Sequence, residues 1–201
     1  MLKDIDPGGD SNPTRLVVSN DLLYFQARDG VHGYELWRTD GTPDGTEMVK
    51  DIYPGELSSS PTIMTDVNGS LFFIADDGEH GFELWKTDGA EVGTVMVKDI
   101  HPTAGSFPQE MTAANDLLFF RASDGVHGEE LWVADGGAPG TFLVADLLPG
   151  SEGSQPTWLT PFNDRLYFVA DDGVHGREIW SVNAEAVQAS NNQIYLPLVI
   201  R

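Results

Sequence analysis

Four histidines of the sequence stand in one repeated motif, Asp-Gly-x-His-Gly, whose side chains could bind a metal ion or a polar ligand. Carboxylate oxygens are ligands that calcium prefers, and imidazole nitrogens bind many divalent cations. If the four motif loops share one face of the fold, we expect the histidines to bind a ligand and the aspartates to hold a metal, with calcium as the candidate ion. The residues are His32, His80, His127 and His175, with Asp29, Asp77, Asp124 and Asp172.

A structural role competes with this site, because a feature that recurs in every repeat is commonly part of the scaffold. In that interpretation the Asp-Gly pair forms a hairpin turn, and the histidine bonds to nearby backbone or to the following glutamate, such as Glu35. That glutamate would satisfy buried hydrogen-bond donors. The sequence contains no Asp-x-Asp-x-Asp-Gly calcium loop.

Tryptophan supplies a further candidate for ligand binding. Trp37, Trp85, Trp132 and Trp180 recur at one place in the repeat, which indicates core packing. Trp158 occurs in the fourth unit alone and is therefore a candidate ligand-binding side chain, for example a platform for a sugar ring. Its place in a predicted strand also favours packing.

Catalysis should show itself as a nucleophile, base or acid pair that one repeat has and the others lack. We find no such pair, no Gly-x-Ser-x-Gly and no phosphate-binding glycine loop. His101 is the one histidine outside the motif, and it lies in a linker. We therefore predict no catalytic residues and a protein that is not an enzyme.

The elements that position these residues form a tandem repeat. The motif recurs at intervals of 48, 47 and 48 residues. Apolar residues within each unit alternate with a period of two, which predicts strands. Four strands fit each unit, and in the first they lie at 14–19, 22–28, 35–37 and 48–52. Aromatic residues on both faces of the second strand indicate a sheet that packs on both sides.

A four-stranded unit of this length, with glycine-rich turns, is typical of a β-propeller blade. We predict an all-β fold in which residues 1–183 form one propeller domain, followed by a C-terminal tail at 184–201. Residues 1–5, MLKDI, match the fourth strand of other units, whereas the fourth unit has none after Trp180. Residues 2–5 could therefore pair with residues 177–182 and close a four-bladed ring. Alternatively, the chain is a fragment of a larger propeller.

The charge of the chain restricts its partners. It has 32 acidic and 11 basic residues and a formal net charge of −21. Such a surface repels nucleic acids and anionic lipids, so we predict neither as a partner and leave protein or glycan partners open. No apolar stretch is long enough to span a membrane, and we predict no membrane insertion. The chain has no cysteine and hence no disulfide.

The strings ELWRTDGTPDGTEMVKDIYPG and ELWKTDGAEVGTVMVKDIHP resemble the ELWxxDGT repeat family of large exported and surface-associated bacterial proteins. The resemblance covers roughly residues 1–183. The third unit departs from the motif at Ala134, Gly137 and Ala138, and the fourth lacks the DGT turn. The resemblance implies an extracellular or cell-surface repeat protein, if the native full-length protein has a signal peptide that is missing from this sequence. We predict a monomer or a part of a longer chain.

Three hypotheses of function follow. The first is a non-enzymatic binding or scaffold module of an exported or surface bacterial protein. The second is a cation-dependent, lectin-like module that binds glycans through the Asp and His residues and Trp158. The third is a propeller hydrolase whose catalytic groups are scattered in the sequence and meet in a central cleft.

Overall fold

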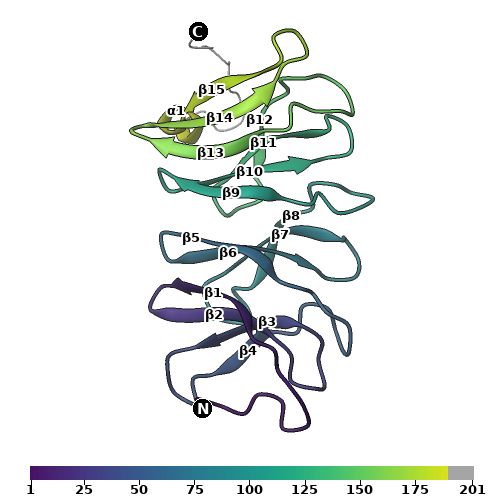
Figure 1. Ribbon diagram of the computed structural model, residues 1–201, viewed down its shortest axis with the longest axis vertical. Coiled ribbons are helices and arrows are strands. Elements are labelled where there is room, and N and C mark those ends of the chain that lie inside the picture. Colours follow the sequence, from purple (N-terminus) through teal and green to yellow (C-terminus); the bar gives the residue numbers. More distant parts are fainter. Residues whose placement is uncertain (190–201) are drawn as a thin grey trace. The chain divides into compact units, whose positions relative to one another are not determined.

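The computed structural model describes residues 1–189, which form antiparallel sheets and one short helix (Figure 1). These residues divide into two compact units. Of the described residues, unit 1 contains residues 1–99 and 103–105, and unit 2 contains residues 100–102 and 106–189. Each unit holds two of the four sequence repeats. No helix among residues 1–189 is long and apolar enough to cross a bilayer.

Unit 1 contains two four-stranded sheets. The first is β1 (Thr14–Ser19), β2 (Leu22–Ala27), β3 (Glu35–Thr39) and β4 (Glu47–Lys50), and the second is β5 (Thr62–Val67), β6 (Ser70–Asp76), β7 (Phe82–Thr87) and β8 (Val95–Lys98). In both sheets each strand pairs antiparallel with the next strand in the sequence. The predicted four-stranded repeat is therefore confirmed in this unit.

Unit 2 contains a four-stranded and a three-stranded sheet. The strands are β9 (Gln109–Ala114), β10 (Leu117–Ser123), β11 (Glu129–Ala134), β12 (Phe142–Ala145), β13 (Thr157–Phe162), β14 (Arg165–Asp171) and β15 (Arg177–Asn183). The last sheet lacks a fourth strand within residues 106–189, as the sequence predicts. Helix α1 (Ala184–Ala189) follows β15 directly. Its buried residues Ala184 and Val187 pack into the core of unit 2. The rest of the predicted tail, residues 190–201, lies outside the described residues.

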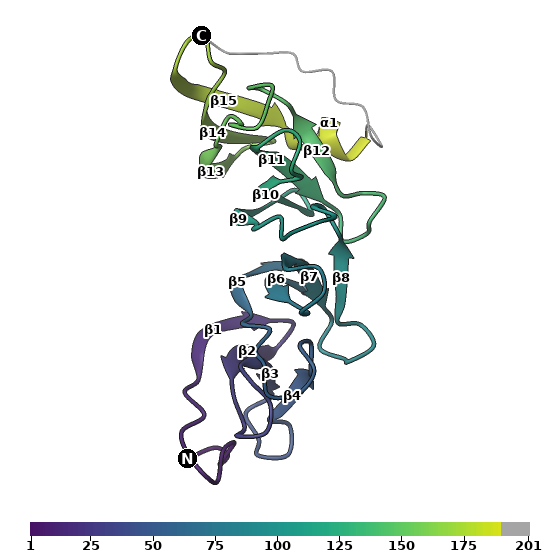
Figure 2. The ribbon, with the colours of Figure 1, turned by 90° about the vertical axis from the view of Figure 1, so that its right-hand side faces the viewer.

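The two sheets of each unit lie next to each other (Figure 2), and the apolar core of each unit contains buried residues from both of its sheets. On β2, Tyr24 is 1% exposed and its neighbour Phe25 is 6% exposed, although successive strand residues point to opposite faces. Tyr24 packs against Leu71 and Phe73 of the second sheet. The first sheet is therefore covered on both faces, which confirms that prediction. The repeated Trp37, like Trp85 and Trp132, is also 6% exposed and belongs to the core.

Residues 1–5 form no strand, yet they lie against the first sheet as a fourth strand of a preceding sheet would. Lys3 donates from Nζ to the Thr46 carbonyl at 2.6 Å. Lys50, at the end of β4, donates in the same way to the Thr94 carbonyl of the second sheet at 2.9 Å. Ile5 packs against the buried face of β2 and β3. The predicted pairing of residues 2–5 with residues 177–182 joins the two units and stays a prediction.

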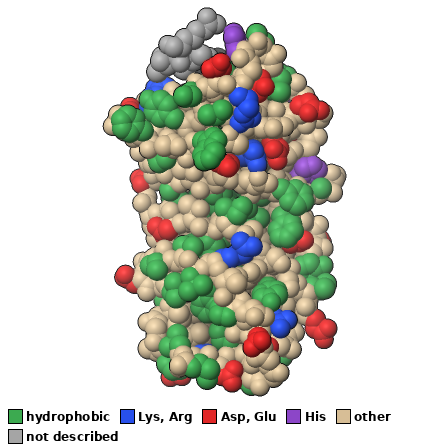
Figure 3. Space-filling model, in the orientation of Figure 1, with side chains coloured by type: hydrophobic (Ala, Val, Ile, Leu, Met, Phe, Trp, Pro, Cys, Tyr) green, Lys and Arg blue, Asp and Glu red, His purple; other side chains and the backbone are tan. Residues whose placement is uncertain are grey.

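On one face of the protein, the acidic residues do not form one dominant patch. On the face shown in Figure 3, Asp and Glu side chains are spread over both units among polar and apolar surface. The formal net charge of −21 attracts cations and repels anions.

Candidate functional site

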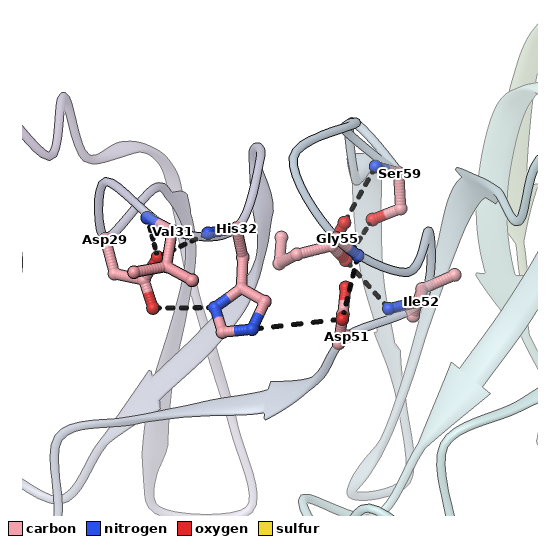
Figure 4. Close-up of polar contacts among 8 residues, drawn as sticks. Asp29, Val31, His32, Asp51, Ile52, Gly55 and Ser59 are labelled. Atoms are coloured by element: carbon pink, nitrogen blue, oxygen red, sulfur yellow. Dashed lines mark hydrogen bonds and ion pairs between the residues drawn. The ribbon is translucent and has the colours of Figure 1, made fainter.

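The Asp-Gly-x-His-Gly loop connects the second and third strands of a repeat and is organised by its aspartate. In the first repeat, Asp29 Oδ1 accepts hydrogen bonds from the backbone N–H of Val31 at 2.9 Å and of His32 at 2.7 Å. Asp29 Oδ2 lies 2.8 Å from His32 Nδ1 (Figure 4). The far side of the ring faces Asp51, with His32 Nε2 3.9 Å from Asp51 Oδ2. The loop thus holds the imidazole between two carboxylates.

The same geometry recurs in the other three repeats. The histidine Nδ1 and the aspartate Oδ2 are 2.8 Å apart for His80 and Asp77, and 2.7 Å apart for both His127 with Asp124 and His175 with Asp172. Each aspartate also accepts hydrogen bonds from the backbone of its own loop. Every predicted metal-binding carboxylate is therefore already engaged within its loop, which favours the structural role of the motif.

These hydrogen bonds shift the pKa of both partners. Burial alone would raise the pKa of Asp29, but the hydrogen bonds from His32 and Val31 outweigh it and lower this pKa. The hydrogen bond to Asp29 raises the pKa of His32, because a carboxylate favours the protonated imidazole. Equivalent hydrogen bonds raise the pKa of His80 and His127.

The glutamate of each motif serves the buried interior. Glu35 is fully buried on β3, and burial raises its pKa. Its Oε2 accepts from the backbone N–H of Ile52 at 3.1 Å, and its Oε1 accepts from that of Ser59 at 2.9 Å (Figure 4). Glu130 makes equivalent bonds to Ser154 in the third repeat. The prediction that this glutamate satisfies buried donors is confirmed.

No group of three or more His, Asp or Glu residues is placed to hold a metal ion among residues 1–189. The predicted ring of four histidines draws on loops from both units, so it stays a prediction, as does bound calcium. Trp158 lies on β13, and its side chain is 78% exposed, unlike the recurring tryptophans.

A polar groove of about 620 Å³ lies beside the motif loop of the first repeat. His32 and Ser58 line it together with Asp6, Arg28 and Tyr34. The guanidinium of Arg28 lies over the ring of Tyr34, with its carbon 5.7 Å from the ring centroid. The Arg28 Nε–H donates to the Asp10 carbonyl at 3.0 Å, so the contact has a defined orientation.

The groove also contains a nearly buried carboxylate. Asp6 is 8% exposed, and its Oδ1 accepts the backbone N–H of Gly8 at 3.1 Å. A Cβ atom at Gly30, which has a φ of +83°, would come within 2.7 Å of this oxygen. The motif glycine therefore allows the loop to approach Asp6 closely. The Tyr34 backbone N–H donates to Ser58 Oγ at 2.9 Å and ties the other wall of the groove together.

The chemistry of this groove is specific to the first repeat. The other repeats have Asp76, Ser123 and Asp171 at the place of Arg28, and Phe82, Glu129 and Arg177 at the place of Tyr34. Opposite the glycine that corresponds to Gly30, they have Tyr53, His101 and Leu148 in place of Asp6. Asp6, Arg28 and Tyr34 do not recur in the other repeats, so a comparison of the repeats for shared residues does not find them. A search for residues that differ between repeats would have found them.

Comparisons with known proteins identify similar structures but no family. No family model matches the sequence, and no curated protein matches it. The crystal structure of puromycin hydrolase matches with a TM-score of 0.58 and 17% identity, over 87% of this chain and 27% of that chain. A serine-to-alanine variant of that enzyme complexed with PGG matches with a TM-score of 0.56 and 18% identity, over 85% of this chain and 27% of that chain.

A third solved structure is an α-L-arabinofuranosidase from Clostridium thermocellum, with a TM-score of 0.32 and 17% identity over 84% of this chain and 66% of that chain. A TM-score of 0.32 does not show a shared fold. The two puromycin hydrolase structures show the fold that the chain shares, and the chain spans about a quarter of their length.

These matches correct the expectation that the protein is not an enzyme, because the solved structures that share its sheets are of a hydrolase. The expectation rested on the absence of a site that one repeat has and the others lack. The groove of Asp6, Arg28 and Tyr34 is such a site, because the other repeats have different residues at these three places.

Proposed function

We propose that the protein is a hydrolase, that its four sheets are blades of a β-propeller, and that the groove of the first repeat binds the substrate. The observation that carries this proposal is the fold shared with puromycin hydrolase over 87% of the chain. The groove supports it independently, because it gathers a cation, a carboxylate, a phenol and an imidazole in one repeat.

Arg28 and Tyr34 are the substrate-positioning residues of this proposal. The Arg28 Nε–H is used by the Asp10 carbonyl, and the rest of the guanidinium is available to donate to a carbonyl or hydroxyl oxygen of the substrate. The ring beneath it restricts its position, since a guanidinium stacked on an aromatic face loses less freedom on binding. Together they would orient a polar group of the substrate toward His32.

His32 is the proton-transfer residue. Asp29 engages Nδ1, and Nε2, which lies 3.9 Å from Asp51 Oδ2, is the nitrogen that would exchange a proton with the substrate, as in a histidine that acts as a general acid or base. The side chain is 30% exposed and lines the groove, so water and substrate can reach it. In this proposal, Nε2 accepts a proton from the attacking water, and the resulting imidazolium returns it to the leaving group.

The proposal also includes two features of the whole protein. Residues 2–5 close the ring of sheets, and the protein is extracellular or on the cell surface, as the resemblance to the ELWxxDGT repeat family implies. The observation in favour of closure is that residues 1–5 lie against the first sheet as a fourth strand would.

A substrate panel tests the proposal. The full chain would be incubated with puromycin, with chromogenic aminoacyl and peptidyl amides and with aryl glycosides. We expect turnover of one class, and we expect Arg28→Met to raise KM by roughly 10- to 100-fold with a smaller change in kcat, as loss of substrate binding does. Arg38→Met is the matched control, because Arg38 lies in the same sheet and pairs with Glu47 outside the groove.

Two results would contradict the proposal. One is the absence of turnover across all three classes by folded protein. The other is an equal effect of the Arg28 and Arg38 substitutions on KM.

A further inference from the structure

The first strand of every repeat contains a bulge at which a residue other than glycine has a positive φ. The register with the second strand shifts there in all four repeats. The residues are Arg15 (61°), Ile63 (47°), Glu110 (57°) and Trp158 (58°). A left-handed backbone is unfavourable for such residues, and most of all for a β-branched one. The repeat therefore retains a strained backbone at this position.

The side chain at the bulge differs completely between repeats. It is a cation, an aliphatic group, an anion and an aromatic ring in turn. Ile63 is 40% exposed and Trp158 is 78% exposed, so the bulge directs large apolar side chains toward solvent. Strained backbone of this kind is concentrated at sites that bind ligands. The bulge thus presents a different chemical group in each repeat on one common backbone.

In unit 2 two of these bulge residues are in direct contact. The backbone N–H of Trp158 donates to Glu110 Oε2 at 2.9 Å, from β13 to the adjacent strand β9. The threonines two residues farther along each strand use their hydroxyls locally. Thr112 donates to the Glu110 carbonyl at 3.1 Å, and Thr160 donates to the Trp158 carbonyl at 2.9 Å. The contact therefore holds the exposed residue Trp158 next to the Glu110 carboxylate, and both threonine hydroxyls are engaged locally.

Electrostatics favours a cation at this place. The protein has a net charge of −21, which attracts cations and repels anions. The basic side chain of Arg177 lies nearby, but it donates to the Gln155 carbonyl, to Thr157 Oγ1 and to the Val169 carbonyl. These three acceptors hold the Arg177 side chain beside Thr157, the first residue of β13.

We propose that Glu110 and Trp158 form a binding site for an organic cation, namely a protonated amine or a guanidinium group. The cation stacks on the indole, which is the best aromatic partner for a cation, and pairs with the carboxylate. Because the site uses the bulges of unit 2 and the proposed hydrolase groove lies in unit 1, the inference does not depend on the proposed reaction.

Ligand-observed NMR with an isosteric pair of probes tests the charge requirement. Choline carries a trimethylammonium group, and 3,3-dimethylbutanol has a neutral group of the same shape. We expect saturation transfer from the full chain to choline and none to dimethylbutanol at equal concentration. Equal transfer to both would overturn the proposal, because it would indicate a merely apolar surface.

Two variants test the residues. Glu110→Gln retains an oxygen that can accept the Trp158 N–H and removes the charge. We expect choline to bind about 2- to 5-fold more weakly, since an ion pair at an exposed site is worth at most about a factor of five. Trp158→Asn removes the ring and keeps a residue that tolerates positive φ, so it should fold and lose binding. Glu47→Gln, an exposed carboxylate of unit 1, is the control. Wild-type affinity in either test variant would overturn the proposal.

Two further probes distinguish the sources of the cation. A capped lysine tetrapeptide that binds at least tenfold more tightly than butylammonium supports a protein partner, and equal affinities support a free amine. Binding of a neutral saccharide that Trp158→Asn abolishes, with no binding of any amine, would overturn the cationic assignment.

Discussion

The carboxylate of Glu35 and the backbone of Ser59 are joined by a buried hydrogen bond of 2.9 Å between Ser59 N and Glu35 Oε1. The Ser59 hydroxyl donates to Oε2 of the same carboxylate at 2.5 Å. Glu35 lies on β3 of the first repeat, and Ser59 lies in the linker to the second. One buried side chain therefore fixes the path of the chain between two successive sheets, and its equivalent in the third repeat does the same.

Substitution of Glu35 by alanine should strongly destabilise the protein. It would leave the buried N–H groups of Ile52 and Ser59 without acceptors, and such losses together cost about 3 to 5 kcal/mol of unfolding free energy. Glu47→Ala is the control, because Glu47 is half exposed and its ion pair with Arg38 should contribute less than about 1 kcal/mol. Urea unfolding of both variants measures the difference. Similar losses in the two would show that Glu35 does not connect the repeats.

The close approach of Gly33 to the linker gives a second prediction. A Cβ atom at Gly33 would lie 2.0 Å from the backbone carbonyl oxygen of Leu57, so Gly33→Ala must displace backbone. We expect a loss of about 3 kcal/mol, as for overpacked interiors. Gly41 has a φ of +92° and no neighbouring atom within 4 Å, and Gly41→Ala should cost only about 1 kcal/mol of backbone strain. Thermal unfolding would contradict this account if it ranked the two variants in the opposite order.

The repeated features of the fold could be predicted from the sequence. The alternation of apolar residues around Tyr24 and Phe25 predicts a strand buried on both faces, and both side chains are buried. Three of the recurring tryptophans, Trp37, Trp85 and Trp132, are core residues, as their fixed place in the repeat indicates, and Trp180 is partly buried against the core of unit 2. Such features are predictable because each repeat packs its sheet in the same way and uses the same residue types at equivalent positions.

The features that differ between repeats could not be predicted in this way. Asp6 and Arg28 come from segments far apart in the sequence, and only the folded loop brings them to one groove. The bulges were missed because no glycine marks the positive φ of Ile63 or Trp158, so the local sequence gives no signal of an unusual backbone. Strain of this kind is imposed by pairing with the neighbouring strands rather than by local preference.

The Asp29–His32 pair predicts a particular pH dependence of stability. The folded-state pKa of His32 is raised, so its contribution is complete below the unfolded value near 6.5 and is lost as pH rises through the folded value. The pKa of Asp29 is lowered, so its contribution is present above its unfolded value of about 3.9 and is lost as pH falls through the lowered folded value. The pair should stabilise the protein most between these two limits.

His32→Gln should therefore lower the melting temperature more at pH 5.5 than at pH 8.5. His80→Gln should behave in the same way, since His80 and Asp77 have the same geometry and the pKa of His80 is also raised. Melting curves of both variants and the wild type across this range provide the measurement. A deficit that grows with pH would show that the charged form of the pair does not contribute to stability.

Turnover by His32→Asn and His80→Asn shows most directly whether the groove of the first repeat is the active site. Each substitution breaks the hydrogen bond between the motif histidine and the motif aspartate of its own loop, His32 with Asp29 and His80 with Asp77. Their effects on stability should therefore be similar. Only His32 lines the groove with Arg28 and Tyr34. With the substrate class that the wild type hydrolyses, we expect His32→Asn to lower kcat by roughly 10² to 10⁴, the usual contribution of a general acid or base, and His80→Asn to leave kcat unchanged. Equal kcat values for the two variants would show that His32 is part of the scaffold and would contradict the assignment of the first-repeat groove as the active site.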